Sequence, residues 1–271
     1  MVMRAKRICV PLLAAADLAV SVPTLAQHDA EHLAKELANP VAALISVPFQ
    51  LNYDPNVGPG RDGDRWTLNI QPVVPVSISQ DWNVISRTVL PVINQDDIAL
   101  NSANQFGLGD TVQSFFFSPK KPTADGIIWG VGPALLLPTG TDDLLGSGKW
   151  GLGPTAVVLK QHGPWTYGAL ANHIWSVAGS SSRADVSSTY LQPFVAHTTK
   201  DAWTYSLNTE STYDWKSEQW TVPINAMVSK LMKIDGQHVS FGGGVRYYVD
   251  SPDNGSKGWG VRLIATLLFP K

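Results

Sequence analysis

The sequence has almost no cysteine, few charges and no long hydrophobic run after its first 26 residues. Its one cysteine, Cys9, lies near the N-terminus, so the rest of the chain can use neither disulfides nor thiol chemistry. The chain lacks the roughly 18 uninterrupted apolar residues that a membrane-spanning helix requires, which excludes a helical membrane protein. Charged residues make up 15% of the chain and the formal net charge is −2, which argues against a nucleic-acid partner.

The N-terminal segment has the pattern of a cleaved export signal. Three basic residues precede an apolar run at 8–22, and small residues at Thr24 and Ala26 suit cleavage after Ala26. We therefore expect a signal peptide at 1–26 and an exported mature protein. Its removal takes away three basic residues and one acidic residue, which leaves 17 basic and 21 acidic residues and a net charge of −4.

Residues 27–40 are predicted to form a short periplasmic helix ahead of a region of strands. Glu31 and Lys35 stand at the favourable i, i+4 spacing on such a helix. His28 and His32 also stand four residues apart, but no third ligand is apparent, so we expect no metal site and no cofactor. Because the helix directly precedes the first strand, one hypothesis is that it plugs the periplasmic mouth of a barrel.

From residue 46 onward, apolar residues alternate with polar residues at period two. This alternation predicts strands, and turn-forming residues separate them. In one strand Asn172 and His173 are adjacent, so one of them would face lipid unless a bulge intervenes. The twelve predicted strands cover about 46–53, 66–79, 82–93, 106–117, 127–137, 150–161, 165–177, 188–199, 203–213, 220–232, 238–249 and 258–269.

The connections between these strands alternate in length. Short turns such as Gln80-Asp81 occur at every second junction, and the junctions between them, such as 54–64 and 138–149, are longer and more polar. Outer-membrane barrels have short periplasmic turns and longer extracellular loops. We therefore predict an all-β, closed antiparallel transmembrane β-barrel of about 12 strands at 41–271, located among the lipids of the bacterial outer membrane.

The last predicted strand, 258–269, shows the clearest alternation. Its outward face is an apolar ladder from Trp259 to Phe269, whereas Arg262 lies on its inward face. We expect this strand to pair with the first strand and so to close the barrel edge. We also expect the barrel-assembly machinery to recognise the chain through this strand.

Tryptophan residues open the predicted strands at two levels. An indole ring prefers the headgroup region of a bilayer, because its body is apolar and its N–H group needs a partner. Two levels therefore predict two aromatic girdles. The expected girdle residues are Trp82, Trp129, Trp165 and Trp203 on the turn side and Trp66, Trp150, Trp220 and Trp259 on the loop side.

Several charged residues share strand faces with polar residues. A charge on the lipid face near the bilayer midplane would cost roughly 2 to 4 kcal/mol, so these residues are expected to face the lumen. There they could select or bind a solute, or they could form ion pairs and hydrogen bonds that fill a modest lumen. The candidate lumen-lining residues are Arg87, Glu210, Arg246 and Arg262. Three arginines against one glutamate point to anions, but acidic loop residues such as Asp142, Asp143, Asp250 and Asp253 could cancel this preference.

Motifs along nearly the whole mature chain resemble one family. They include E-L-A-N-P-V-A-A-L-I-S-V-P-F-Q-L-N-Y at 36–53, N-I-Q-P-V-V-P at 69–75, L-P-T-G-T-D-D at 137–143 and G-K-W-G-L-G-P at 148–154. These runs resemble a family of Gram-negative outer-membrane proteins often labelled neuromedin U or transporter, which is similar to the MetA-pathway phenol-degradation proteins. The resemblance implies a barrel that passes small organic compounds, and it brings no catalytic residues with it.

The sequence therefore predicts a porin-like passive channel or transporter for small organic or aromatic molecules, and not an enzyme. The main alternative is a non-conducting structural or surface-binding barrel whose long loops are the working part. A barrel lipase is a third alternative, because His238 and Ser240 share a strand face and could act as base and nucleophile. However, no residue that would orient the histidine stands at an obvious following position.

Overall fold

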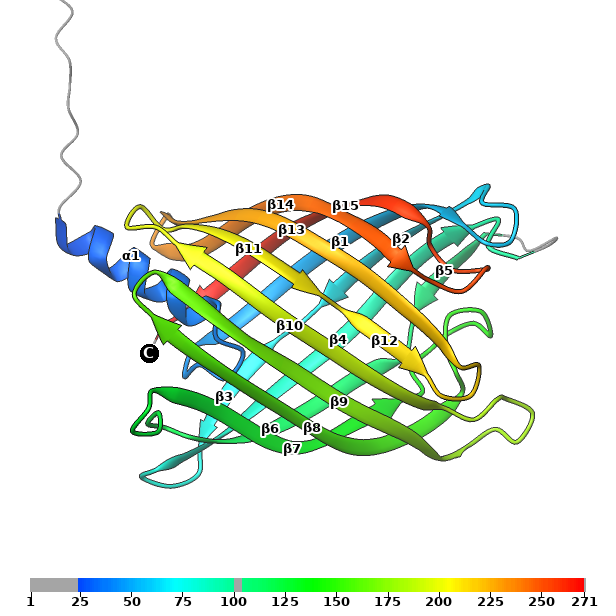
Figure 1. Cartoon of the computed structure of the whole chain (residues 1–271), viewed down its shortest axis with the longest axis horizontal. Coiled ribbons are helices and arrows are strands. Elements are labelled where there is room, and N and C mark those ends of the chain that lie inside the picture. The colour runs from blue at the N-terminus through cyan, green and yellow to red at the C-terminus, as the bar shows by residue number, and fades with distance from the viewer. Residues whose placement is uncertain (1–23, 100–103, 271) are drawn as a thin grey trace, which may run out of the picture.

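The structure is a computed structural model that describes residues 24–99 and 104–270. One helix, α1 (Thr24–Leu37), precedes an antiparallel sheet of fifteen strand segments that closes on itself (Figure 1). Within the described residues, no helix is both long and apolar enough to cross a membrane. The strand segments are β1 (Ile45–Val57), β2 (Gly63–Ile70), β3 (Val73–Ser77), β4 (Trp82–Asp96), β5 (Gln105–Leu108), β6 (Thr111–Pro119), β7 (Ile127–Leu137), β8 (Lys149–His162), β9 (Trp165–Gly179), β10 (Ser187–Thr198), β11 (Trp203–Thr209), β12 (Ser211–Asp214), β13 (Gln219–Ile234), β14 (Gln237–Asp250) and β15 (Gly258–Phe269).

The predicted helix ahead of the strands is present as α1, with different ends. It begins at Thr24 and so includes the last three residues of the predicted signal peptide, whose residues 1–23 lie outside the described part of the chain. It ends at Leu37, three residues before the predicted end. The Val41 N–H donates a hydrogen bond of 3.0 Å to the Asn39 side chain, and the proline between them has no N–H, so the chain leaves the helix here.

The fifteen segments form twelve wall strands, because three of the wall strands are each interrupted once. The two segments of an interrupted strand pair with a common neighbouring strand; they are β2 with β3, β5 with β6, and β11 with β12. The first break lies at Gln71 and Pro72, where proline cannot donate to the ladder. The other two lie at Gly109-Asp110 and at Glu210. The predicted all-β, closed antiparallel barrel of twelve strands is therefore confirmed.

Pairing of the first and last strands closes the ring. β1 and β15 are antiparallel over nine residue pairs, from Ile45 opposite Phe269 to Tyr53 opposite Val261. Across the barrel, β9 pairs with β10, so the described sheet has no free edge. The predicted closure by the last strand is confirmed.

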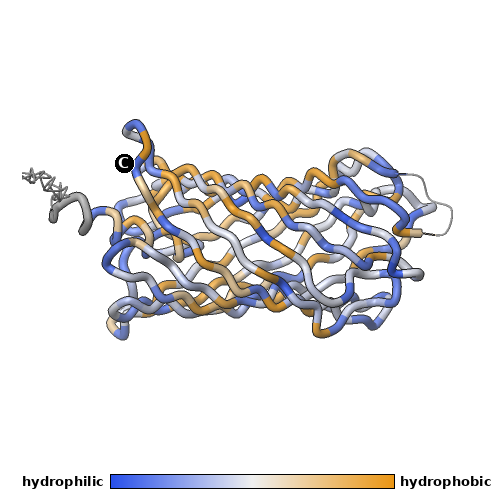
Figure 2. The backbone as a smooth tube through the Cα atoms, turned by 90° about the horizontal axis from the view of Figure 1, so that it is seen from above, coloured by the Kyte–Doolittle hydropathy of each residue, from blue (hydrophilic) through white to orange (hydrophobic). Residues whose placement is uncertain are grey.

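Side chains alternate between the outside and the inside of the barrel along each strand. On β15, Leu263 is 55% exposed and its neighbour Arg262 is 1% exposed. Figure 2 shows hydrophobic positions along the length of the barrel and hydrophilic ones gathered at the loops of its ends. The outside is therefore apolar, and many polar side chains are buried inside.

The adjacent polar residues of β9 obey the alternation without a bulge between them. Asn172 lies opposite Tyr190 on the inward face, so His173 faces outward. Its ring nitrogen Nδ1 lies 2.7 Å from the Thr189 hydroxyl, and its ring packs 4.1 Å from that of Trp175. A neighbouring hydroxyl thus gives the outward imidazole a polar partner.

The apolar outside gives a first test of the lipid environment. Leu263→Arg places a charge on the outward face of β15, and we expect it to lower the free energy of unfolding by about 2–4 kcal/mol in lipid vesicles. The matched change Leu144→Arg, at a loop residue that is 47% exposed, should cost less than about 0.5 kcal/mol. Urea titration of the refolded variants measures both. Equal stability of the two variants would contradict a lipid-facing β15.

Candidate functional site in the barrel interior

A strap formed by α1 and residues 38–44 closes the end of the barrel that carries the short turns. Leu33 and Leu44 of the strap are 9% and 4% exposed, and with Ala34 and Ala42 they pack against the wall residues Ala202, Leu231 and Leu268. The Gln161 side chain donates a hydrogen bond of 2.9 Å to the Lys35 carbonyl oxygen. Figure 1 shows α1 entering the barrel at this end.

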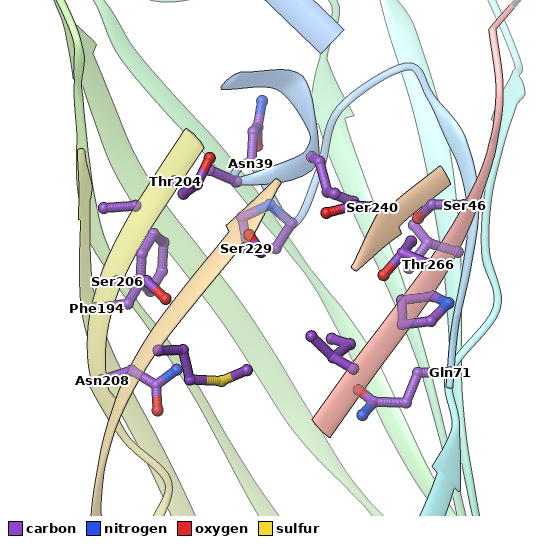
Figure 3. A pocket seen from close by; sticks show the side chains of 18 of the residues that line it. Asn39, Ser46, Gln71, Phe194, Thr204, Ser206, Asn208, Ser229, Ser240 and Thr266 are labelled. Atoms are coloured by element: carbon purple, nitrogen blue, oxygen red, sulfur yellow. The ribbon is translucent and has the colours of Figure 1, made fainter. Parts of the chain in front are cut away.

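Behind the strap lies an interior cavity of about 270 Å³. Residues of the strap form one boundary, and inward side chains of β1, β10, β11, β13 and β15 form much of its wall (Figure 3). The lining combines hydroxyl and amide groups with apolar groups. Among the lining residues are Gln71, Val73, Arg87, Phe194, Ile264 and the Arg262–Glu210 pair.

The Arg262–Glu210 pair spans the interior. The two terminal nitrogens of Arg262 lie 2.8 and 2.7 Å from the two carboxylate oxygens of Glu210, and its Nε donates to the Asn52 side chain at 2.7 Å. Arg262 is 1% exposed, so a fully buried cation is held by a bidentate carboxylate and an amide. β13 and β14 separate β15 from β12 in the sheet, so the pair ties non-adjacent strands together.

A second buried pair lies nearer the long loops. The Arg246 guanidinium donates to the Asp54 carboxylate at 3.3 Å, and both side chains are less than one-tenth exposed. The ring of Tyr248 lies 5.0 Å from the guanidinium carbon. Gly260 makes room for this pair, because a Cβ at that position would lie 2.6 Å from an Asp54 oxygen.

Two further arginines make hydrogen bonds to amides. The Arg87 guanidinium donates to the Gln71 side chain at 3.2 Å, and the Arg65 guanidinium donates to Gln95 at 2.8 Å. Gln95 is 1% exposed, so this contact is well inside the barrel. We call this interior set the arginine belt; it consists of Arg65, Arg87, Arg246, Arg262, Asp54 and Glu210, with a formal charge of +2.

The structure places all four sequence-predicted charged residues inside and brings Arg262 and Glu210 into direct contact. Two interior charges were not predicted from the sequence: Asp54 was placed in a loop, and Arg65 lies between that loop and the next predicted strand. The strands extend beyond their hydrophobic alternation, since β1 ends at Val57 and β2 begins at Gly63. The polar positions of the strand pattern could have revealed Asp54, because the inward-facing series of β1 continues at every second residue as far as Asp54.

The β7–β8 loop, residues 138–148, folds over the other end of the barrel. Leu145 is 7% exposed, and the neighbouring Leu144 carbonyl accepts a hydrogen bond of 3.3 Å from Gln95 inside the barrel. The Asp110 carboxylate accepts hydrogen bonds from the Gly140 and Ser147 N–H groups at 3.1 and 2.6 Å. These contacts fix the loop inward and leave an outer cavity of about 460 Å³ beside Arg65.

A nearby ion pair at the loop-side end of the barrel links the start of β8 to the β9–β10 loop. The Lys149 ammonium lies 2.9 Å from the Asp185 carboxylate. The hydrogen bond and positive charge of Lys149 hold the pKa of Asp185 below its usual value. This pair lies beside the inward loop and is more exposed than the pairs of the arginine belt.

The eight predicted girdle tryptophans stand at the strand ends, and seven of them are exposed on the outside, whereas Trp129 is half-buried. On the turn side, Trp82 and Trp129 form an edge-to-face pair with ring centroids 5.8 Å apart. On the loop side, Trp66, Trp220 and Trp259 each pack on a tyrosine of the neighbouring strand at 4.4–4.9 Å. Their role as membrane girdles stays a prediction.

The residues of the lipase alternative do not form an outward-facing catalytic pair. Ser240 is 4% exposed and lines the interior cavity, so a lipid acyl chain outside the barrel cannot reach it.

The side chain of His28, one of the two histidines considered for a metal site, lies outside the described part of the structure. Among the side chains that are described, no three His, Cys, Asp or Glu residues gather into a metal-binding group.

The closed antiparallel sheet with an apolar outside and a polar interior defines a β-barrel of the outer-membrane type. The structure is similar to that of an outer membrane channel from Pseudomonas putida F1, with a TM-score of 0.63 and 16% identity over 83% of this chain and 94% of that chain. A low-pH structure of OprB from Pseudomonas putida matches with a TM-score of 0.27 and 7% identity over 87% of this chain and 95% of that chain, too low a score to indicate a shared fold. No protein-family model and no curated protein matches the sequence.

The Arg262–Glu210 pair can be tested through stability. Glu210→Ala leaves a buried guanidinium without its carboxylate, and we expect the free energy of unfolding to fall by about 3–5 kcal/mol. The double variant Glu210→Leu with Arg262→Met removes both charges and should recover most of this loss. Denaturant titration in lipid vesicles measures each variant.

The matched control is Asp253→Asn, which breaks the more exposed pair with Lys257 and should change stability little. A Glu210→Ala protein as stable as this control would show that the buried pair does not hold the wall strands together.

Proposed function

We propose that the protein is a passive channel in the outer membrane of a Gram-negative bacterium, through which small molecules pass. The observation that carries this proposal is a charged interior with a cavity towards each end, inside a barrel whose outside is apolar. The stability of the barrel does not require a charged interior, because buried ion pairs are often no more stabilising than apolar residues of equal volume. The likeness in fold to a channel from Pseudomonas putida F1 supports the same class of function.

The proposal includes the arrangement in the cell. Residues 1–26 would be removed as an export signal, the helix at 27–40 and the short turns would face the periplasm, and the long loops would face outside. The tryptophans at the strand ends would form the two girdles, and the terminal strand would be recognised by the barrel-assembly machinery. The motif resemblance supports membership of the neuromedin U-labelled transporter family and similarity to the MetA-pathway phenol-degradation proteins.

The arginine belt sets the charge preference of this channel. Its four arginines and two carboxylates leave a formal charge of +2 around the interior. In a narrow, low-dielectric lumen this charge attracts small anions and repels cations. The hydroxyl, amide and apolar groups of the interior cavity suit small organic solutes.

A non-conducting structural or surface-binding barrel is the second candidate. The observation that favours it is the occupation of both ends, by the strap on the turn side and by the β7–β8 loop on the loop side. In that case the loops would be the working part and the charged pairs would serve only the fold. Electrical recording separates the two candidates.

We expect refolded protein in planar bilayers to conduct and to prefer chloride over potassium in a KCl gradient. Arg65→Gln should reduce this preference, because it removes one charge from the belt. The matched control Arg61→Gln removes the same charge from an exposed loop and should change little at high salt, where the Debye length falls to about 3 Å near 1 M.

Two results would contradict the channel together: no conductance by the refolded protein, and no uptake defect for small solutes in a deletion strain. Conductance with a preference for potassium would leave the channel in place and contradict the role of the arginine belt.

Removal of the strap helix should open the turn side. We expect deletion of residues 27–39 to raise single-channel conductance severalfold, and Leu33→Asp to have a smaller effect in the same direction, because a buried charge weakens the apolar contact with the wall. The exposed helix residue Asp29 provides the control Asp29→Asn, which should conduct like the unmodified protein. Unchanged conductance after the deletion would rule out the strap as a plug.

A further inference from the structure

We propose that the interior cavity is a binding site for small organic monoanions, with the carboxylate of the ligand held by Arg87. This inference deepens the proposed channel and rests on it, because a ligand reaches the cavity only through the barrel. It begins with a difference between Arg87 and the other arginines of the belt.

Of the two belt arginines that line the interior cavity, Arg87 and Arg262, Arg87 keeps most of its hydrogen-bonding capacity for a ligand. Arg65 also donates one hydrogen bond to an amide, but it lines the outer cavity. Arg262 uses three nitrogens on Glu210 and Asn52, and Arg246 is paired with Asp54. Arg87 donates one hydrogen bond, to the amide oxygen of Gln71, and no carboxylate of the described residues forms an ion pair with it. A guanidinium has five N–H donors in a planar fork that matches a carboxylate.

The neighbouring amide holds Arg87 in place for this role. Gln71 is 9% exposed, and its backbone N–H donates to the Pro48 carbonyl at 2.9 Å, so the residue is fixed where β2 ends. Both Gln71 and Arg87 line the cavity. The uncharged Gln71 amide orients the Arg87 guanidinium without forming an ion pair with it.

The rest of the cavity suits an apolar body. Phe194 stands across the cavity from Gln71, as Figure 3 shows, and Val73 and Ile264 also line it. The volume of about 270 Å³ is just below the roughly 300–1,000 Å³ that is common for ligand sites, so the ligand must be small. An aromatic ring or short hydrocarbon chain carrying one carboxylate fits both the lining and the size.

The other charges at the cavity favour a single negative charge. Glu210 is neutralised by Arg262. Glu36 of the strap also lines the cavity, and α1 contacts β10 and β13, which lie across the ring from β4 and Arg87. A second carboxylate on the ligand would therefore approach Glu36 and be repelled.

Benzoate and benzyl alcohol provide a matched pair of probes, because they share the ring and differ in the carboxylate. Binding to refolded protein in detergent micelles is measured by saturation-transfer NMR titration, with the signal from empty micelles subtracted. We expect benzoate to bind at least about tenfold more tightly than benzyl alcohol, as a charged bidentate contact implies.

Arg87→Gln should reduce benzoate affinity to that of benzyl alcohol, and Arg87→Lys should restore part of it, since lysine keeps the charge and loses the fork. The control Arg61→Gln removes one charge from an exposed loop and should leave the affinity unchanged. Heat-modifiable gel mobility confirms that each variant is folded. The comparison of the two probes on the unmodified protein does not depend on any variant folding.

Equal affinity for the two probes, or full benzoate binding by folded Arg87→Gln protein, would overturn the inference. The outcome is distinct from that of the bilayer experiment. Conductance without benzoate binding overturns the binding site and leaves the channel, whereas benzoate binding with neither conductance nor an uptake defect supports the site and overturns the channel.

Discussion

Closure of the sheet by the pairing of β1 with β15 is the constraint on which the rest of the structure depends. Each wall strand faces lipid on one side, where no water can satisfy a free backbone N–H or C=O group. The nine residue pairs between 45–53 of β1 and 261–269 of β15 supply the last set of backbone hydrogen-bond partners. Once the ring is closed at twelve strands, the alternation along each strand assigns every side chain to the inside or the outside.

The inside created by this closure is too polar to be packed like an ordinary core. Asn52, Asp54, Arg246 and Arg262 stand on three adjacent strands, β1, β15 and β14, and all are less than one-tenth exposed. Such groups are tolerated only with partners, because a buried charge without one is costly. The Arg262–Glu210 and Arg246–Asp54 pairs meet this requirement, and the room for the second pair depends on a glycine at position 260.

The sequence was enough to predict the barrel and the inward direction of its charges, because a period of two is a direct consequence of strand geometry. It was not enough to predict the partners. Glu210 and Arg262 are 52 residues apart, and only the order of strands around the ring brings them together. Asp54 and Arg65 were missed because hydrophobic alternation ends before the strands do. The breaks at Gly109 and Glu210 also had no local signal, since neither residue by itself ends a strand.

The two ends of the barrel are closed by contacts of different strength, and this difference bears on how a solute could pass. The β7–β8 loop is fixed by hydrogen bonds that its N–H groups donate to Asp110 and by one that it accepts from Gln95. The strap is held mainly by apolar contacts: two leucines and two alanines pack on one part of the wall, and Val41 packs on another part that includes Ile85 and Phe116. These contacts are apolar and non-directional, and the strap forms no backbone ladder with the described strands of the sheet. The wall is held by continuous ladders on both sides of every strand. Movement of the strap would therefore leave the ring intact, and under the proposed function it would connect the interior cavity with the periplasm.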